Sequence, residues 1–251
     1  MKTIVIIGAS GDVGAAATDA LIGANHTVVA VSRGFRQLSK QHEQNLKSDR
    51  FHPVEGSMEN EASASIVLEK VRQKVDRIDA VLASINSSPQ RPETLLEWGS
   101  DALLRTIHDN LVTHFVAAKT FIPAIADAGL YLGIGGGMAD KLFPYYAYNS
   151  MIQSALRMMF RYLDHENTAR RIEIRELIIS AMVTTDEKAN TGERKFNWIT
   201  SHQVGEHIAS MIETPAAFAG PIQLLNSSHG VGRSLSMELT PPPPPSPQAN
   251  V

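Results

Sequence analysis

Length, composition and charge limit what this chain can be. It has 251 residues, 43% hydrophobic and 20% charged, which is enough to bury one large core. Its net charge of −3 gives no reason to expect nucleic acid as a partner, and the absence of cysteine excludes disulfides and thiolate metal sites. No apolar run approaches the ~18 residues of a membrane-spanning helix, and the N-terminus enters a strand without a signal peptide. We therefore expect a cytoplasmic protein with no membrane segment and no metal site.

The first 22 residues have the pattern of a strand, a tight turn and a helix. Residues 2–7 are a mostly β-branched apolar run, residues 8–14 read Gly-Ala-Ser-Gly-Asp-Val-Gly, and residues 15–22 are rich in alanine. Glycines let backbone N–H groups approach a pyrophosphate, and the helix N-terminus behind them offers unpaired donors. The alternative is an ordinary glycine-rich turn. The pattern favours dinucleotide binding through Gly8, Ser10, Gly11, Asp12, Val13 and Gly14.

The next strand, residues 27–31, ends in Ser32 and Arg33. An acidic residue at this place would bind a free ribose 2′-hydroxyl, whereas arginine suits a 2′-phosphate through charge-assisted hydrogen bonds. We therefore expect Ser32 and Arg33 to contact the cofactor and favour NADP(H) over NAD(H). The alternative for Arg33 is a solvated loop arginine.

Helical and extended patterns alternate along the rest of the chain. We expect, in order, a helix at 35–47, an edge strand containing Pro53 at 51–55, a helix at 62–75, a strand at 78–83, one broken or two consecutive helices over 95–128, a strand at 130–134, a helix at 150–170, a strand at 172–179, a helix at 202–212 and a strand at 221–225. This alternation predicts an α/β fold: a Rossmann-like, doubly wound, mostly parallel sheet with helices on both faces. We assign residues 1–239 to this single domain and 240–251 to a proline-rich disordered tail.

Over residues 3–230 the chain resembles the short-chain dehydrogenase/reductase family. Asn110 stands where that family has a helix-kinking asparagine that holds a proton-relay water. Residues 180–185 occupy the place of the family's P-G-x-x-x-T segment, and Thr185 matches the threonine near the nicotinamide. Ser84 and Asn86, in place of the usual Asn-Asn-Ala-Gly, are expected to meet the cofactor. The resemblance also implies a small-molecule substrate, a substrate lid near 186–200, and a homodimer or homotetramer formed through the helices around 110–126 and 151–163.

The resemblance implies a catalytic serine, tyrosine and lysine, with the last two spaced Y-x-x-x-K. Here Tyr145, Tyr146 and Tyr148 are followed four residues later by Asn149, Ser150 and Ile152, and none of these is lysine. We favour Tyr145 with Asn149, because an i,i+4 pair keeps a polar group on one helical face, and keep Tyr148 as the alternative. Any of these tyrosines can also be a wall of the substrate pocket.

The family's serine is also replaced. Gly135-Gly136-Gly137 stands in its place, and we expect this segment to leave room for a substrate and to offer N–H donors to an oxyanion. A flexible loop without a catalytic role is the alternative.

Three functions are compatible with this pattern. The favoured one is an NADP(H)-dependent oxidoreductase that acts on a carbonyl or alcohol substrate with an altered proton relay. The second is a non-catalytic nucleotide-binding protein, and the third is a non-redox enzyme such as a cyclase, dehydratase or isomerase.

Overall fold

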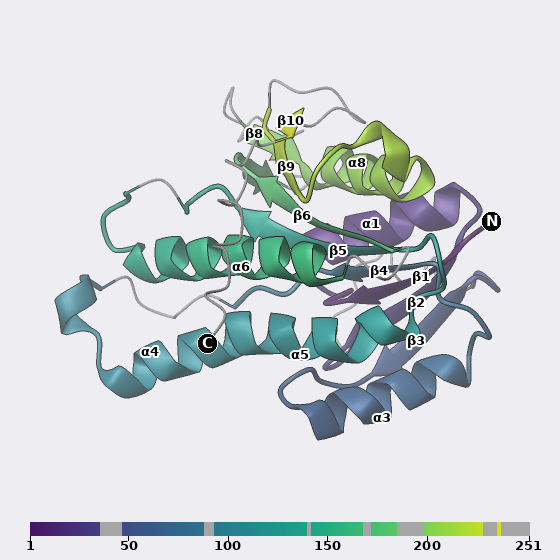
Figure 1. Ribbon diagram of the computed structural model, residues 1–251, viewed down its shortest axis with the longest axis horizontal. Coiled ribbons are helices and arrows are strands. Elements are labelled where there is room, and N and C mark those ends of the chain that lie inside the picture. The colour runs from purple at the N-terminus through teal and green to yellow at the C-terminus, as the bar shows by residue number, and fades with distance from the viewer. Residues whose placement is uncertain are drawn as a thin grey trace, which may run out of the picture.

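A single twisted sheet organises the structure, a computed structural model that describes residues 1–35, 47–87, 93–139, 142–167, 172–184, 198–227 and 235–236. Within these residues the sheet has eight strands in the order β10-β9-β6-β5-β4-β1-β2-β3 (Figure 1), and only β10 pairs antiparallel. The chain starts at β1 in the sheet's interior, moves outward to β3, and returns to build β4, β5, β6 and β9 on the other side. This is the doubly wound α/β arrangement that the sequence predicts.

The element bounds complete this description. The strands are β1 (Thr3–Ile7), β2 (Thr27–Ser32), β3 (Phe51–Glu55), β4 (Ala80–Ala83), β5 (Leu130–Gly136), β6 (Glu173–Ile179), β7 (Met182–Thr184), β8 (Trp198–Thr200), β9 (Ile222–Leu225) and β10 (Leu235–Ser236). The α-helices are α1 (Asp12–Gly23), α3 (Glu61–Arg72), α4 (Ser100–Ile107), α5 (Thr113–Phe121), α6 (Ala147–Glu166) and α8 (Ser201–Glu213). Short helical turns lie at Leu95–Glu97, His108–Val112, Ile122–Ala124 and Pro215–Ala217.

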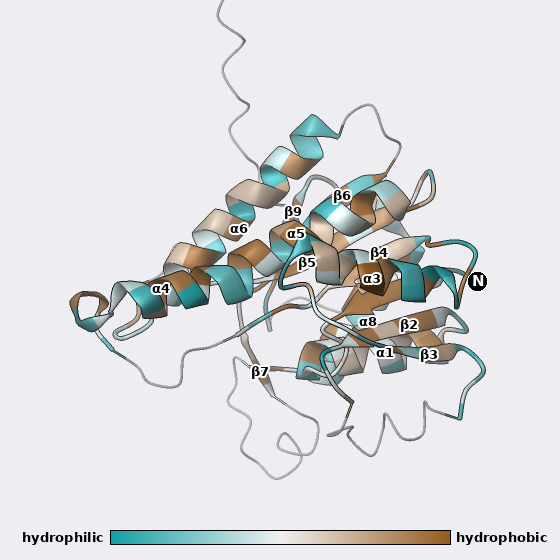
Figure 2. Cartoon of the chain, turned by 90° about the horizontal axis from the view of Figure 1, so that it is seen from below, coloured by the Kyte–Doolittle hydropathy of each residue, from teal (hydrophilic) through white to brown (hydrophobic). Residues whose placement is uncertain are grey.

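Helices cover both faces of the sheet, with α1 and α8 on one side and α3, α5 and α6 on the other (Figure 1). The parallel strands consist largely of β-branched and other apolar residues because both of their faces are buried, and β2 is largely brown in Figure 2. Close packing requires small residues at two positions. A side chain on Gly205 of α8 would collide with the Ala16 carbonyl of α1, and one on Gly133 of β5 would collide with the Phe160 ring of α6.

The predicted elements agree with the structure to within a few residues, and three of the expectations are refined. β3 lies at the sheet edge, as Pro53 predicts. The segment expected to be one broken or two consecutive helices is broken by a π-helical turn at His108–Val112, between α4 and α5. Strand β5 continues through Gly136, and α6 begins at Ala147, three residues earlier than expected.

A second, two-stranded sheet was not predicted: β7 pairs in parallel with β8, so residues 182–184 and 198–200 lie side by side. β8 falls in the segment expected to form a lid. The rest of that segment, residues 36–46 of the helix expected at 35–47, and the tail at 240–251 lie outside the described residues.

None of the helices in the described residues combines the length and the apolar composition that crossing a membrane requires. The same residues contain no group of three or more His, Cys, Asp or Glu side chains suited to hold a metal ion.

Candidate functional site

The turn between β1 and α1 is held tightly against the end of β4. Gly8 has φ +84°, a left-handed conformation that favours glycine, and a Cβ there would collide with the carbonyl oxygen of Ser84. A Cβ on Gly14 would collide with the carbonyl oxygen of Gly8. Gly11 is the N-cap of α1 and has no side chain to accept from the first N–H groups of the helix. The turn is therefore a tightly packed backbone cradle that requires glycine at residues 8 and 14, and with the uncapped start of α1 it fits the pyrophosphate of a dinucleotide.

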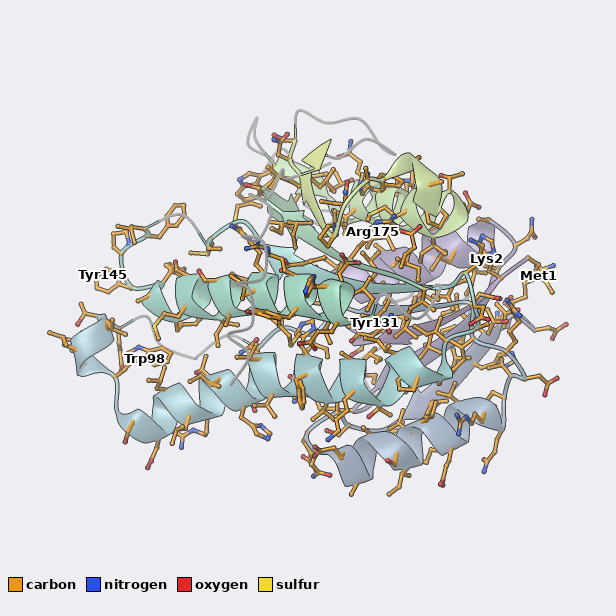
Figure 3. The ribbon with its side chains drawn as sticks, viewed as in Figure 1. Met1, Lys2, Trp98, Tyr131, Tyr145 and Arg175 are labelled. Atoms are coloured by element: carbon orange, nitrogen blue, oxygen red, sulfur yellow. The ribbon has the colours of Figure 1, made fainter. Side chains whose placement is uncertain are left out.

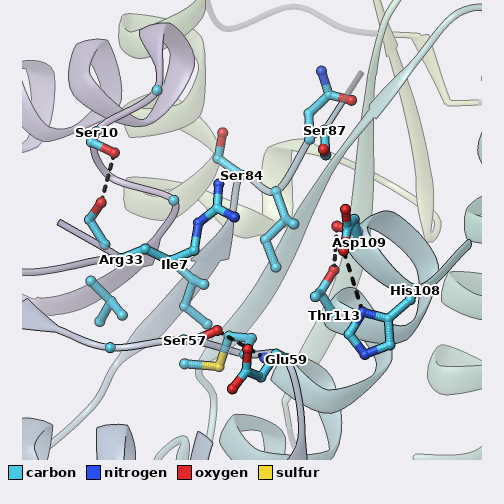
Figure 4. A pocket seen from close by; sticks show the side chains of 18 residues that line it. Ile7, Ser10, Arg33, Ser57, Glu59, Ser84, Ser87, His108, Asp109 and Thr113 are labelled. Atoms are coloured by element: carbon cyan, nitrogen blue, oxygen red, sulfur yellow. Dashed lines mark hydrogen bonds and ion pairs between the residues drawn. The ribbon is translucent and has the colours of Figure 1, made fainter. Parts of the chain in front are cut away.

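A pocket of about 310 Å³ opens beside this cradle, at the carboxyl edge of the sheet (Figure 4). The structure brings seven of the predicted cofactor residues to its wall: Gly8, Ser10, Gly11, Ser32, Arg33, Ser84 and Asn86. The Oγ atoms of Ser10 and Ser32 lie 2.7 Å apart, which links the glycine turn to the end of β2. Asp12, Val13 and Gly14 lie behind this wall in the first turn of α1. Thr185 lies outside the described residues.

The pocket carries both signs of charge. Arg33 lies on the same side as Ser10, while His108 and Asp109 lie on the opposite side with Thr113 (Figure 4). Glu59 also lines the pocket, so the guanidinium of Arg33 shares it with two carboxylates. Sequence reasoning missed Glu59, His108 and Asp109. The end of β3 could have pointed to Glu59, because parallel strands end at one edge, but the other two depend on how α4 folds over the sheet.

Two buried side chains hold the loop after β4, which forms one wall of the pocket. The Asn110 amide donates to the carbonyls of Ser87 and Thr106, at 2.9 Å each, and its Oδ1 accepts from the Ser87 N–H at 2.8 Å. The Nε2 of His114 donates to the Ile85 carbonyl at 3.0 Å. Asn110 lies in the π-helical turn, so the helix departs from α-geometry there. The side chain of Asn110 is hydrogen-bonded to the backbone of the loop.

The predicted catalytic residues do not line this pocket. Tyr145 precedes α6, is 53% exposed and has φ +68°, so the expectation that Tyr145 and Asn149 share one helical face is wrong (Figure 3). Tyr148 is the buried one, and its ring stacks on Trp98 with centroids 5.2 Å apart. Asn149 donates from Nδ2 to the sulfur of Met138 at 3.6 Å, next to the glycine segment.

The glycine segment at the end of β5 differs from what we expected. The N–H of Gly136 donates to the Gln153 Oε1, and the N–H of Gly137 donates to the Ile179 carbonyl at 3.1 Å. These two N–H groups are thus already used within the protein, so the expected oxyanion donors are wrong for both. Glu176 of β6 also lies against this segment and is 1% exposed. Burial raises the pKa of its carboxyl to about 8, while the positive charge of Arg157 acts to lower that pKa.

Comparison with known proteins identifies this architecture. The family model for short-chain dehydrogenases matches residues 2–195. The chain belongs to the short-chain dehydrogenase family. This family consists of oxidoreductases, so the chain is an oxidoreductase by family. No curated protein matches the chain in sequence.

Solved structures of short-chain dehydrogenases share the fold at low sequence identity. An alcohol dehydrogenase from Thermococcus sibiricus in complex with 5-hydroxy-NADP is 21% identical, has a TM-score of 0.75, and the match covers 91% of this chain and 97% of that one. A 3-ketoacyl-(acyl-carrier-protein) reductase from Brucella melitensis in complex with NADH is 15% identical, with a TM-score of 0.73 and coverages of 89% and 95%. A short-chain oxidoreductase from Pseudomonas aeruginosa PAO1 "containing an atypical catalytic center" is 12% identical, with a TM-score of 0.76 and coverages of 88% and 94%.

The buried clamp at His114 predicts a contribution to stability that acid removes, opposite in sign to the contribution of the buried Glu176 carboxyl. Burial lowers the pKa of His114 from 6.5 to about 4, and its Nδ1 has no hydrogen-bond partner among the described residues. Because the unfolded chain binds this proton more readily than the folded one, the stabilisation is complete above pH 6.5 and is lost as the pH falls toward 4. The expected loss is on the order of 3 kcal/mol across this window.

Urea unfolding of the wild type and of His114→Gln between pH 4.5 and 7.5 measures this effect. The variant keeps a side-chain N–H for the Ile85 carbonyl but cannot titrate. The free energy of unfolding of the wild type should therefore decrease relative to that of the variant as the pH falls. Gly23→Ala, which changes no titratable group, should keep the wild-type slope. If the free energy of unfolding depended on pH in the same way in the wild type and in His114→Gln, the low pKa of His114 would be contradicted.

Proposed function

We propose that this chain is an NADP(H)-dependent oxidoreductase that interconverts a small carbonyl compound and its alcohol. The observation that carries the proposal is the backbone cradle at Gly8–Gly14 with Arg33 in the same pocket and no carboxylate at the end of β2. When bound, the reduced nicotinamide supplies a hydride to the carbonyl carbon. The protein's part is to hold the nucleotide, orient the substrate and deliver a proton to the carbonyl oxygen.

Residues from several walls of the pocket would bind the nucleotide. The N-terminus of α1 and the backbone of Gly11 face the pyrophosphate, where the helix dipole favours negative charge. Arg33 binds the 2′-phosphate, and the Ser10–Ser32 contact fixes the turn beside it. Asn110 and His114 keep the loop with Ser84 and Asn86 in place before the cofactor arrives. Thr185 contacts the nicotinamide end, as in the family motif that it matches.

The similar structures support this proposal in two respects. One of them is in complex with an NADP derivative and another with NADH, which is consistent with a nucleotide bound to this fold. A third is described as having an atypical catalytic centre, which is consistent with an oxidoreductase that lacks the family's serine and lysine.

The proton donor in this proposal is a tyrosine just before or at the start of α6. Tyr145 has a left-handed backbone, which is uncommon for a residue with a bulky side chain and is a reason to suspect a functional constraint. Tyr148 is held by its stacking on Trp98. A tyrosine without a neighbouring ammonium keeps its proton at neutral pH, so it serves better as an acid in reduction than as a base in oxidation.

One observation favours a second function, that of a nucleotide-binding protein without catalysis. Seven of the residues proposed to bind the nucleotide line one pocket, whereas Tyr145, Tyr148 and Asn149 lie outside its lining. Binding without turnover would support this second function over the first.

We also propose a homodimer or homotetramer. Several apolar residues of the helices expected to form the interface, among them Ala118, Phe121, Leu156 and Phe160, pack in the core. Exposed apolar residues nevertheless remain along α4, α5 and α6: Leu104, Phe115, Met151, Met158 and Tyr162. These residues support an isologous contact between two copies.

The cofactor proposal predicts a change of preference in Arg33→Ala. The wild type should bind NADPH more tightly than NADH, and the variant should lose roughly tenfold in NADPH affinity with little change for NADH, because a charge-assisted bond to phosphate is removed. Fluorescence titration with both nucleotides measures this. Arg72→Ala, on α3 and outside the pocket, should behave like the wild type. Equal affinity of the wild type for both nucleotides would contradict the preference for NADPH. If the wild type bound neither nucleotide, the proposal that the glycine turn binds the pyrophosphate would be contradicted.

The proton-donor proposal predicts that carbonyl reduction exceeds alcohol oxidation at pH 7. Either Tyr145→Phe or Tyr148→Phe should lower the rate of reduction by about 100-fold, the usual loss when a general acid is removed. The test is NADPH oxidation over a panel of aldehydes and ketones. Tyr146→Phe, a partly exposed tyrosine of the same cluster, is the matched control. Full turnover in both test variants would mean that water or substrate supplies the proton.

The assembly proposal predicts a dimer or larger species at micromolar concentration in light scattering. Met158→Glu should shift the equilibrium toward the monomer, because it places a charge in the apolar surface of α6. Ile66→Glu is the control, since Ile66 is also exposed but lies on α3. A monomeric wild type would overturn the proposal.

A further inference from the structure

The glycine segment at the end of β5 is covered by polar side chains from its neighbours. At Gly135 a Cβ would collide with the Glu176 carboxyl, and at Gly137 it would lie 2.6 Å from the Ser180 Oγ. Only at Gly136 is there room, with the nearest atom, the Gln153 Cδ, 3.5 Å away. Glycine at 137 is therefore required by the Cα and Cβ of Ser180, whereas a side chain at 135 would have to displace the Glu176 carboxyl.

Ser180 is placed by the pairing of β5 with β6. It follows β6 directly, its N–H donates to the Leu225 carbonyl at 2.8 Å, and the preceding carbonyl, that of Ile179, accepts from the N–H of Gly137. These bonds anchor the backbone on both sides of Ser180. Its hydroxyl therefore occupies the space of a side chain at residue 137, although it comes from a different strand.

Ser180 lies on the same side of the sheet as α6, the helix near which the proposed proton donor lies. Successive side chains of a strand point to opposite faces, and Ser180 continues the row of Glu176 and Ile178. Glu176 lies beside Gln153 of α6 at the same glycine, and Ile178 packs in the core layer that contains Phe160 of α6. Ser180 thus lies at the carboxyl edge on the side of α6, the helix preceded by Tyr145, and it is half-buried.

We propose that Ser180 donates the hydroxyl hydrogen bond to the substrate's carbonyl oxygen that a serine on β5 gives in the family. This inference rests on the proposed reductase function. In the reduction, a carbonyl compound, NADPH and one proton give an alcohol and NADP⁺. The carbonyl carbon receives the hydride, and its oxygen becomes negative until it takes the proton. A donor aimed at that oxygen stabilises this charge, while the proton itself comes from the tyrosine or from water.

The test compares Ser180→Ala with the conservative variant Ser180→Thr. Ser180→Ala should lower kcat by about 100-fold, as when one oxyanion donor is lost, with NADPH affinity and the urea midpoint unchanged. Ser180→Thr keeps the hydroxyl and should retain activity within about tenfold, and Ser210→Ala on α8 is the control.

A second readout does not depend on turnover. Isobutyramide has a carbonyl that accepts hydrogen bonds but resists hydride, and its affinity for the NADPH-loaded protein can be followed by nucleotide fluorescence. Ser180→Ala should weaken this binding about tenfold. Unchanged kcat and isobutyramide affinity in Ser180→Ala would overturn the inference and leave the reductase function standing. Failure of the wild type to bind NADPH, or to reduce any carbonyl compound, would instead overturn the proposed function.

Discussion

The contact between Gly8 and the end of β4 sets the geometry of the whole site. Its positive φ and the absence of a side chain let the backbone lie against the Ser84 carbonyl, while the N–H groups of Gly8 and Ala9 both donate to the Val31 carbonyl of β2, at 3.0 and 3.1 Å. One turn thus joins the ends of β1, β2 and β4. Because the turn is fixed on three strands, the direction of α1 is fixed too, and its N-terminus faces the pocket.

The opposite wall of the pocket depends on buried hydrogen bonds. In the described part of the loop after β4, residues 84–87, the side chains of Asn110 and His114 bond the backbone of Ser87 and Ile85 from the helical side. Such bonds are costly to break because each partner would be left unpaired in the core. Asn110 reaches the loop from the π-helical turn, and His114 reaches it from the first turn of α5. The wall is therefore formed before a ligand arrives, and binding avoids the entropy of ordering it.

Sequence alone predicted what depends on local pattern. Alternating strands and helices predicted the doubly wound sheet, the end of the second strand pointed to Ser32 and Arg33, and the family resemblance pointed to Ser84 and Asn86; all four line the pocket beside the glycine turn. It could not predict contacts between distant segments. The start of α6 after Tyr145, the place of Asp109 in the pocket and the side chains over the glycines all depend on how helices pack on the sheet, which no local spacing encodes.

The glycine segment shows why a missing motif is weak evidence for lost chemistry. Read along β5, three glycines indicate that the strand has lost its polar group. Read across the sheet, Glu176 and Ser180 stand where side chains of Gly135 and Gly137 would be, so the two sets of residues depend on each other. A serine placed at 137 alone would collide with Ser180, and one at 135 with Glu176. Polar groups at this edge therefore come from the neighbouring strand, and a sequence motif written for one strand does not detect them.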